Sequence, residues 1–179
     1  MAHIITVPSP LLRQPAKSVA QLDARIQKVL IDMEKALKNA IDPQGVGLAA
    51  PQIGQLLRIF MIRPVADGPI TTFINPQIVK YSQRQINPLT KKGIYEGCLS
   101  LPHHYAPIKR SSSITIKYQK LEPRTYNLIP AQETYSGFAA HVIQHEIDHL
   151  NGILFIDRVL EQNAKLYRVE GDQWVEVSL

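Results

Sequence analysis

Apolar residues recur along this chain with two different spacings, which separate the segments expected to be helical from those expected to be extended. Within residues 21–39 they fall at steps of three and four residues, which predicts an amphipathic helix. Within residues 113–119 apolar and polar side chains alternate, which predicts a half-exposed strand. A second helix is expected from about 134 to 150, where most positions are apolar and Asn151-Gly152 follows as a stop signal.

Short apolar runs elsewhere predict further strands. We expect them at residues 58–63, 71–74, 77–81, 126–129, 153–156, 165–170 and 174–177. Asn75-Pro76 should separate the second run from the third, because proline has no N–H for a strand ladder. The last two runs flank Gly171-Asp172, which predicts a hairpin. Strands that cluster between an early and a late helix indicate an α+β fold, with the early helix covering a sheet and the late helix central.

Composition limits the class of protein without naming it. A chain of 179 residues with 45% hydrophobic and 20% charged residues is expected to form one globular domain, residues 1–179, with 165–179 as a terminal hairpin or extended tail. The sequence contains no signal peptide pattern and no apolar run of membrane-spanning length, so we expect a cytoplasmic protein with no membrane partner. A single cysteine, Cys98, excludes an internal disulfide.

The net charge of +5 is mild and is not concentrated in any Lys/Arg-rich run, so no nucleic-acid motif is expected. This charge would fit transient contact with an anionic ribosome surface, although an ordinary solvated face explains it more simply.

The segment His145-Glu146-Ile147-Asp148-His149 carries the strongest chemical signal. On a helix of about 3.6 residues per turn, the two histidines project from one face and can bind a single metal ion. Glu146 would then reach the open side of that ion as a proton carrier. The same spacing also occurs by chance on solvated helices. Here the helix is apolar, and a metal would satisfy imidazoles that are otherwise buried without partners.

Two histidines do not complete such a site, because a catalytic centre usually has three protein ligands and one open position. No histidine follows His149, so Asp157 and Glu161 are downstream candidates. Upstream, Cys98 could supply a thiolate, although a lone cysteine without other evidence is more often a small core residue. The glycine- and alanine-rich segment 45–52 is by itself typical of a tightly packed connection, and Gln52 adds an amide donor to it.

Taken together, the three segments resemble peptide deformylase. The motifs G-x-G-L-A-A-x-Q, E-G-C-L-S and Q-H-E-x-D-H of that family stand intact at residues 45–52, 96–100 and 144–149, and the similarity extends over about residues 4–158. The resemblance implies an α+β fold with antiparallel β-sheets around a central metal-binding helix. It also implies a metal-dependent hydrolase that removes the formyl group from the N-terminal formyl-methionine of nascent polypeptides and releases formate.

The resemblance assigns roles to the motif residues. Cys98, His145 and His149 would be the metal ligands, and Glu146 the general acid/base for a metal-bound water that attacks the formamide carbonyl. The Gln52 side chain and the Leu99 N–H would stabilise the oxyanion. One Fe²⁺ ion per chain is implied, with Zn²⁺, Ni²⁺ or Co²⁺ able to substitute, whereas ligand softness alone would favour zinc.

The same family pattern suggests the residues that contact the peptide. The methionine side chain would lie among Val46, Ile94, Phe138, His141 and Val142, although packing in an ordinary core also explains the apolar members of this set. Backbone groups of Gly47, Gly97 and Leu99 would bind the peptide as an added strand.

Three features depart from the family pattern. His103-His104-Tyr105 stands after Pro102 where many members have a glycine, Gln44 replaces a frequent acidic residue, and the tail beyond Arg158 lacks the pattern of a long terminal helix. Two other functions remain open from the residues alone. A zinc endopeptidase would use a carboxylate as third ligand and be indifferent to Cys98→Ser, and a non-catalytic relative would not need Glu146 or Gln52.

Overall fold

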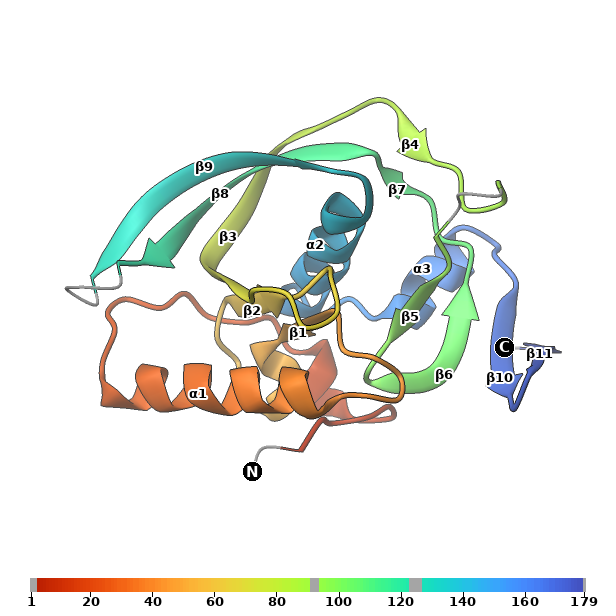
Figure 1. Ribbon diagram of the computed structural model, residues 1–179, viewed down its shortest axis with the longest axis horizontal. Helices are drawn as coiled ribbons and strands as arrows, with labels where there is room; N and C mark the ends of the chain where they lie inside the picture. The colour runs from red at the N-terminus through yellow and green to blue at the C-terminus, as the bar shows by residue number, and fades with distance from the viewer. Residues whose placement is uncertain (1–2, 91–93, 123–126, 179) are drawn as a thin grey trace.

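The computed structural model describes residues 3–90, 94–122 and 127–178, which form helices and antiparallel sheets (Figure 1). The first sheet has the order β1 (Gly47–Ala49), β2 (Ile59–Ile62), β3 (Thr71–Tyr81), β8 (Ser113–Leu121) and β9 (Leu128–Ser136). The second has the order β11 (Gln173–Val177), β10 (Leu166–Glu170), β6 (Leu101–Ala106) and β5 (Glu96–Cys98). A small third sheet pairs β4 (Gln85–Ile86) with β7 (Arg110–Ser111). The α+β prediction is confirmed.

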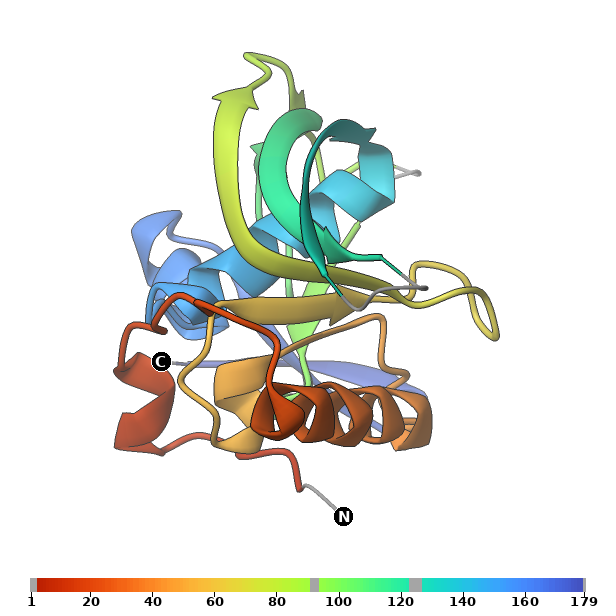
Figure 2. The same ribbon diagram turned by 90° about the vertical axis from the view of Figure 1, so that its left-hand side faces the viewer.

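The first sheet lies between two helices, α1 (Ala24–Asn39) and α2 (Gly137–Leu150), and strand β2 shows why. Its four residues are all buried, and successive side chains point to opposite faces of the sheet. Phe60 and Ile62 belong to the hydrophobic core that contains α2, whereas Ile59 and Met61 belong to the core that contains α1. In Figures 1 and 2 the long strands β3, β8 and β9 curve over α2, and α1 lies on the other side of β1 and β2.

Helix α1 follows the prediction for residues 21–39 but begins three residues later. The Asp23 carboxylate accepts a hydrogen bond from the Ile26 N–H at 2.8 Å and caps the first turn. The buried residues of this helix recur at the predicted spacing of three and four residues, and they are Ile26, Val29, Leu30, Met33, Ala36 and Leu37.

Two of the strand predictions were wrong. Residues 71–81 form the single strand β3, because a register shift between Ile74 and Gln77 takes Asn75 and Pro76 out of the regular ladder. Residues 153–156 do not form a strand: helix α3 (Phe155–Glu161) begins there, and the Asp157 carboxylate accepts the Leu154 N–H at 2.8 Å.

The boundary before α2 also differs from the prediction. Residues Thr134 to Ser136 are the end of β9, whose ladder with β8 continues to the Ser113–Ser136 pair. The helix begins only at Gly137, which has a φ of +60°. Of the strand expected at 126–129, Tyr126 lies outside the described residues, and β9 begins at Leu128.

Both ends of the chain support the second sheet and the adjoining 3₁₀-helix η2 (Ala50–Ile53). Strands β10 and β11 form the expected hairpin around Gly171, and β10 extends the sheet by pairing with β6. In the N-terminal arm, the Ile5 N–H donates to the Gln52 carbonyl at 2.7 Å and the Val7 N–H donates to the Ser100 carbonyl at 2.9 Å. These bonds hold the arm against the segments that carry Gln52 and Cys98.

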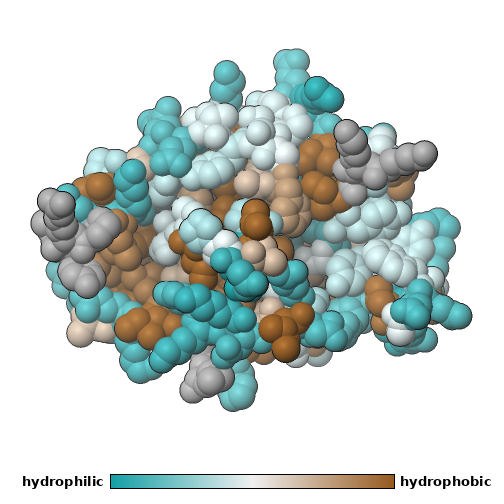
Figure 3. All heavy atoms as spheres, viewed as in Figure 1, coloured by the Kyte–Doolittle hydropathy of each residue, from teal (hydrophilic) through white to brown (hydrophobic). Residues whose placement is uncertain are grey.

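Hydrophobic residues on the face shown in Figure 3 form separate patches among hydrophilic ones. Among the helices of the described residues, none is long and apolar enough to cross a membrane.

Candidate metal centre

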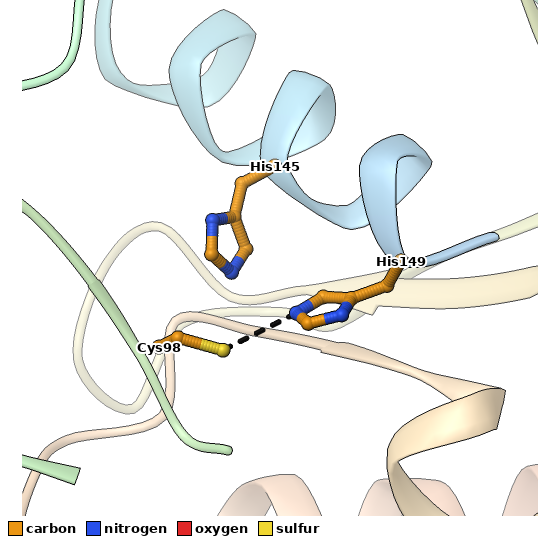
Figure 4. Close-up of side chains that lie close together, drawn as sticks. All are labelled: Cys98, His145 and His149. Atoms are coloured by element: carbon orange, nitrogen blue, oxygen red, sulfur yellow. Dashed lines mark hydrogen bonds between the residues drawn. The ribbon is translucent and has the colours of Figure 1, made fainter. Parts of the chain in front are cut away.

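Helix α2 brings His145 and His149 together, and strand β5 adds Cys98 (Figure 4). The histidines lie one helical turn apart with ring centroids separated by 4.9 Å. Cys98 Sγ lies 3.2 Å from His149 Nε2. One potential ligand atom from each of the three residues lies within 4.8 Å of the others, and all three side chains are buried. This is the one such group found in the part of the chain that the structure describes.

The surroundings of Cys98 favour its thiolate form. The Ser100 N–H points at Sγ from 3.4 Å, and Gln52 Nε2 lies 3.7 Å away. Burial opposes ionisation of the thiol, but electrostatic interactions and hydrogen bonds with His149 and His145 outweigh it and hold the pKa of Cys98 well below its ordinary value. One thiolate and two imidazoles form a donor set that suits late divalent ions, so the residues present fit a single metal ion.

His145 is oriented by a buried network of charges. Its Nδ1 lies 2.8 Å from Glu96 Oε1, which leaves Nε2 for the metal side. Arg110 donates to both oxygens of Glu96, at 2.7 and 2.8 Å, and to Asp148 Oδ2 at 2.6 Å. Although burial would raise the pKa of Glu96, the charges of Arg110 and His145 hold it well below its ordinary value. Glu96 is therefore a carboxylate that fixes the histidine ring.

The Glu146 carboxyl group is buried beside the Cys98, His145 and His149 group. Its Oε2 is buried and has no hydrogen-bond partner within the described residues. Burial raises the pKa of Glu146 to about 7. The backbone of Gly47 approaches so closely that a Cβ built there would lie 2.2 Å from Glu146 Oε1. A carboxyl group that can hold or release a proton near neutral pH therefore faces the site.

Gln52 lies beside Cys98 and is held in one orientation. Its Oε1 accepts the Ala49 N–H at 2.8 Å, and its Nε2 donates to Ser100 Oγ at 3.1 Å. These two bonds distinguish the oxygen of the amide from its nitrogen, and they direct the N–H₂ group toward the Cys98 thiol. Gln52 is 1% exposed, so little of its donor capacity is spent on solvent.

A cavity of about 260 Å³ opens beside these residues. Its lining includes Glu146, Gln52, Leu99 and every residue that the sequence suggested for peptide contact: Val46, Gly47, Ile94, Gly97, Phe138, His141 and Val142. His141 also belongs to the charge network, since its Nε2 lies 2.8 Å from Glu96 Oε2, without the angle of a hydrogen bond.

The two downstream carboxylates lie elsewhere. Asp157 pairs with Arg13 at 2.7 Å, and Glu161 pairs with Arg158 at 2.7 Å. Neither belongs to the metal-binding group found among the described residues. The third ligand position therefore falls to the thiol, not to a downstream carboxylate.

Sequence reasoning missed the residues that support the site. Arg110 gave no signal, because it reaches Glu96 and Asp148 only through the tertiary fold. Asp148 gave a weak one, since a carboxylate inside an apolar helix needs a cationic partner. Ser100 belongs to the E-G-C-L-S motif, which by itself assigns no role to it, and in the structure its hydroxyl accepts a hydrogen bond from Gln52 Nε2.

The site contains the groups that a metal-dependent hydrolase needs. Three ligand residues converge to hold one metal ion, and a carboxyl group beside them can carry a proton near neutral pH. A family model described as polypeptide deformylase matches residues 1–165, and the chain belongs to that family, whose members remove the formyl group from N-terminal methionine.

Individual relatives agree with this assignment. The peptide deformylase of Dictyoglomus thermophilum is 38% identical over 163 residues, which cover 91% of this chain and 95% of that protein. The crystal structure of the Thermotoga maritima peptide deformylase has a TM-score of 0.74 at 36% identity, covering 88% of this chain and 97% of that one. A peptide deformylase structure from Legionella pneumophila gives a TM-score of 0.74 at 36% identity, with coverages of 88% and 85%.

Proposed function

We propose that this protein hydrolyses the formamide of formyl-methionyl peptides with Cys98, His145 and His149 holding one Fe²⁺ ion. Zn²⁺, Ni²⁺ or Co²⁺ would fit the same donors, since thiolate and imidazole bind all of these ions. When bound, the ion supplies the Lewis acidity that makes water a usable nucleophile near neutral pH. The convergence of Cys98 with the two histidines is the single observation that carries this proposal.

The peptide would bind as an extended strand between two sheet edges. β1 is the edge strand of the first sheet and β5 is the edge strand of the second. Gly47 of β1 and Gly97 of β5 both line the cavity. Unpaired backbone groups at such edges can bind an added strand. In this arrangement the methionine side chain would extend toward Phe138, His141 and Val142 of α2, with Val46 and Ile94 beside it.

Glu146 would take the proton of the attacking water and return it to the departing amine. A pKa near 7 suits both transfers, since the group is then a competent base and a competent acid at the same pH. Gln52 Nε2 and the Leu99 N–H would donate to the oxygen that becomes negative during attack. Removing one such donor typically lowers the rate by about 10²–10³-fold.

Replacing Gly47 by alanine is expected to lower kcat by about 10²-fold, the effect of moving a catalytic group by about 1 Å. The new Cβ would lie 2.2 Å from Glu146 Oε1 and 2.8 Å from Val142 Cγ1, so the carboxylate must shift. Formate release by the metal-loaded variant measures the effect. Gly171→Asn is the matched control, since Gly171 lies in the C-terminal turn with nothing near its Cβ position. Equal kcat values for Gly47→Ala and wild type would contradict the close packing of Glu146.

One assay tests the function as a whole. Protein loaded anaerobically with Fe²⁺, or with Ni²⁺, should release formate from formyl-Met-Ala-Ser, and Cys98→Ser should lose both tight metal binding and formate release. Cleavage of internal peptide bonds that survives Cys98→Ser would instead identify a zinc endopeptidase. Stable metal binding without release of formate would identify a non-catalytic relative.

We also propose that residues 1–179 form one catalytic domain that acts in the cytoplasm, where nascent formylated chains emerge. The net charge of +5 supports transient contact with the anionic ribosome surface.

A further inference from the structure

Four aromatic side chains pack together beside the cavity: Tyr95, Tyr105, Tyr167 and Trp174. We call them the aromatic cluster. The Trp174 ring is centred 5.3 Å from Tyr95, 5.2 Å from Tyr105 and 6.1 Å from Tyr167. Trp174 is nevertheless 50% exposed, and Tyr95 is 37% exposed. The cluster therefore presents aromatic surface to solvent where the segment that contains β5 and β6 meets the C-terminal hairpin of β10 and β11.

The strand register shows that the cluster occupies the outer face of the second sheet. Tyr105 pairs with Tyr167, and Trp174 pairs with Val169, two residues further along β10. Side chains two residues apart share a face, so these aromatic rings lie together. The opposite face carries Cys98, Ala106 and Leu166, which pack with α3. The C-terminal hairpin of β10 and β11, whose second strand carries Trp174, thus extends the sheet that carries Cys98. Figure 1 shows this hairpin beside β6.

The aromatic cluster is continuous with the peptide-binding cavity. Tyr95 and Tyr105 line that cavity. The Tyr105 ring lies over Gly97 of the edge strand β5, where a Cβ would come within 2.7 Å of it. A peptide that adds to the β5 edge would therefore run alongside the cluster.

Successive side chains of an extended peptide point to opposite faces of the sheet. If the methionine side chain points inward to α2, the side chain of the second residue points outward, to the face of Tyr95 and Trp174. We propose that the aromatic cluster binds the second residue of the formyl peptide and favours a large apolar or aromatic side chain there. This inference rests on the proposed function and adds a sequence preference to it.

A comparison of two substrates tests the preference. We expect kcat/KM for formyl-Met-Phe-Ser to exceed that for formyl-Met-Ala-Ser by about threefold to tenfold, the range expected for an aromatic pair. Trp174→Ala and Tyr95→Ala should each bring this ratio close to one. Val175→Ala is the matched control, because Val175 is a similarly exposed neighbour on the opposite face of β11 and should leave the ratio unchanged.

A binding measurement without turnover completes the test. Trp174 is the only tryptophan of the chain, so its fluorescence reports directly on the cluster. In metal-loaded Glu146→Gln protein, formyl-Met-Phe-Ser should change the emission in a saturable way, and more strongly than formyl-Met-Ala-Ser. This titration keeps Trp174 in place and decides the matter even where Trp174→Ala does not fold.

Two results would overturn the inference: equal emission with both peptides, or an equal loss of kcat/KM for both peptides in Trp174→Ala and Tyr95→Ala. The cluster would then only attach the hairpin to the sheet. Failure of the wild-type protein to release formate from either peptide is a different result, which would contradict the proposed function and this inference with it.

Discussion

Replacing Glu146 by glutamine is expected to lower kcat for formate release by about 10²–10⁴-fold, the usual contribution of a general acid/base. Glutamine keeps the shape of the side chain and so keeps the close packing against Gly47. It removes the group whose pKa burial raises to about 7, and with it the means of accepting and returning a proton. Metal binding should persist, because Glu146 is not one of the three clustered ligand residues.

Formate release and metal content measured on the same preparation check this result. Glu34→Gln is the control, because Glu34 is a half-exposed glutamate on α1 that pairs with Lys38 far from the site. Glu146→Gln protein that retains its metal and works at the wild-type rate would remove Glu146 from the mechanism. Loss of the metal together with activity would show that Glu146 acts on metal binding instead.

The histidine pair could be predicted from the sequence because it depends on local geometry alone. A spacing of four residues fixes two side chains on one helical face wherever that helix lies. The flanking apolar residues predicted its burial, and residues 140–150 are all buried. Cys98 is different, because it lies 51 positions before His149 and meets it only through the tertiary fold. Its role came from the family resemblance, not from spacing.

The errors in the fold arose where tertiary contacts override local signals. Asn75-Pro76 interrupts the hydrogen-bond pattern of a strand, yet β3 continues past it. The Asn75 side chain accepts from the Val19 N–H and donates to the Val19 carbonyl, both at 2.8 Å, which ties the irregular point to the N-terminal arm. Residues 153–156 resemble a strand because a short apolar run has no distinct period, and the Asp157 cap decides in favour of a helix.

The charged residues that support the site, Glu96, Arg110 and Asp148, were the least predictable part of it. Each of their ion pairs joins segments that are distant in the sequence. Arg110 lies 14 residues from Glu96 and 38 from Asp148 in sequence. No period or motif connects these positions. Asp148 alone gave a hint, because it lies within an apolar helix and a buried charge there needs a partner. The pairing itself could be read only from the fold.

Replacing Arg110 by methionine is expected to destabilise the protein by about 3–5 kcal/mol. The substitution removes the cationic partner that the buried carboxylates of Glu96 and Asp148 share. Arg110 is 7% exposed, and it donates to both oxygens of Glu96 and to Asp148. Asp148 retains Arg158, whereas Glu96 loses its only arginine partner among the described residues. Urea unfolding of the metal-free protein measures this change without interference from the ion.

The same substitution should also weaken metal binding by about 10–100-fold, the usual effect of disturbing a group that orients a metal ligand. Glu96 holds the His145 ring through Nδ1, and a buried Glu96 that has lost Arg110 will either take up a proton or move toward solvent. Arg13→Met is the matched control, since Arg13 makes a bidentate but exposed pair with Asp157 and should change stability by less than about 1 kcal/mol. If Arg110→Met were as stable as Arg13→Met and bound metal as tightly as the wild type, Arg110 would neither hold Glu96 nor, through it, fix the ring that faces the ion.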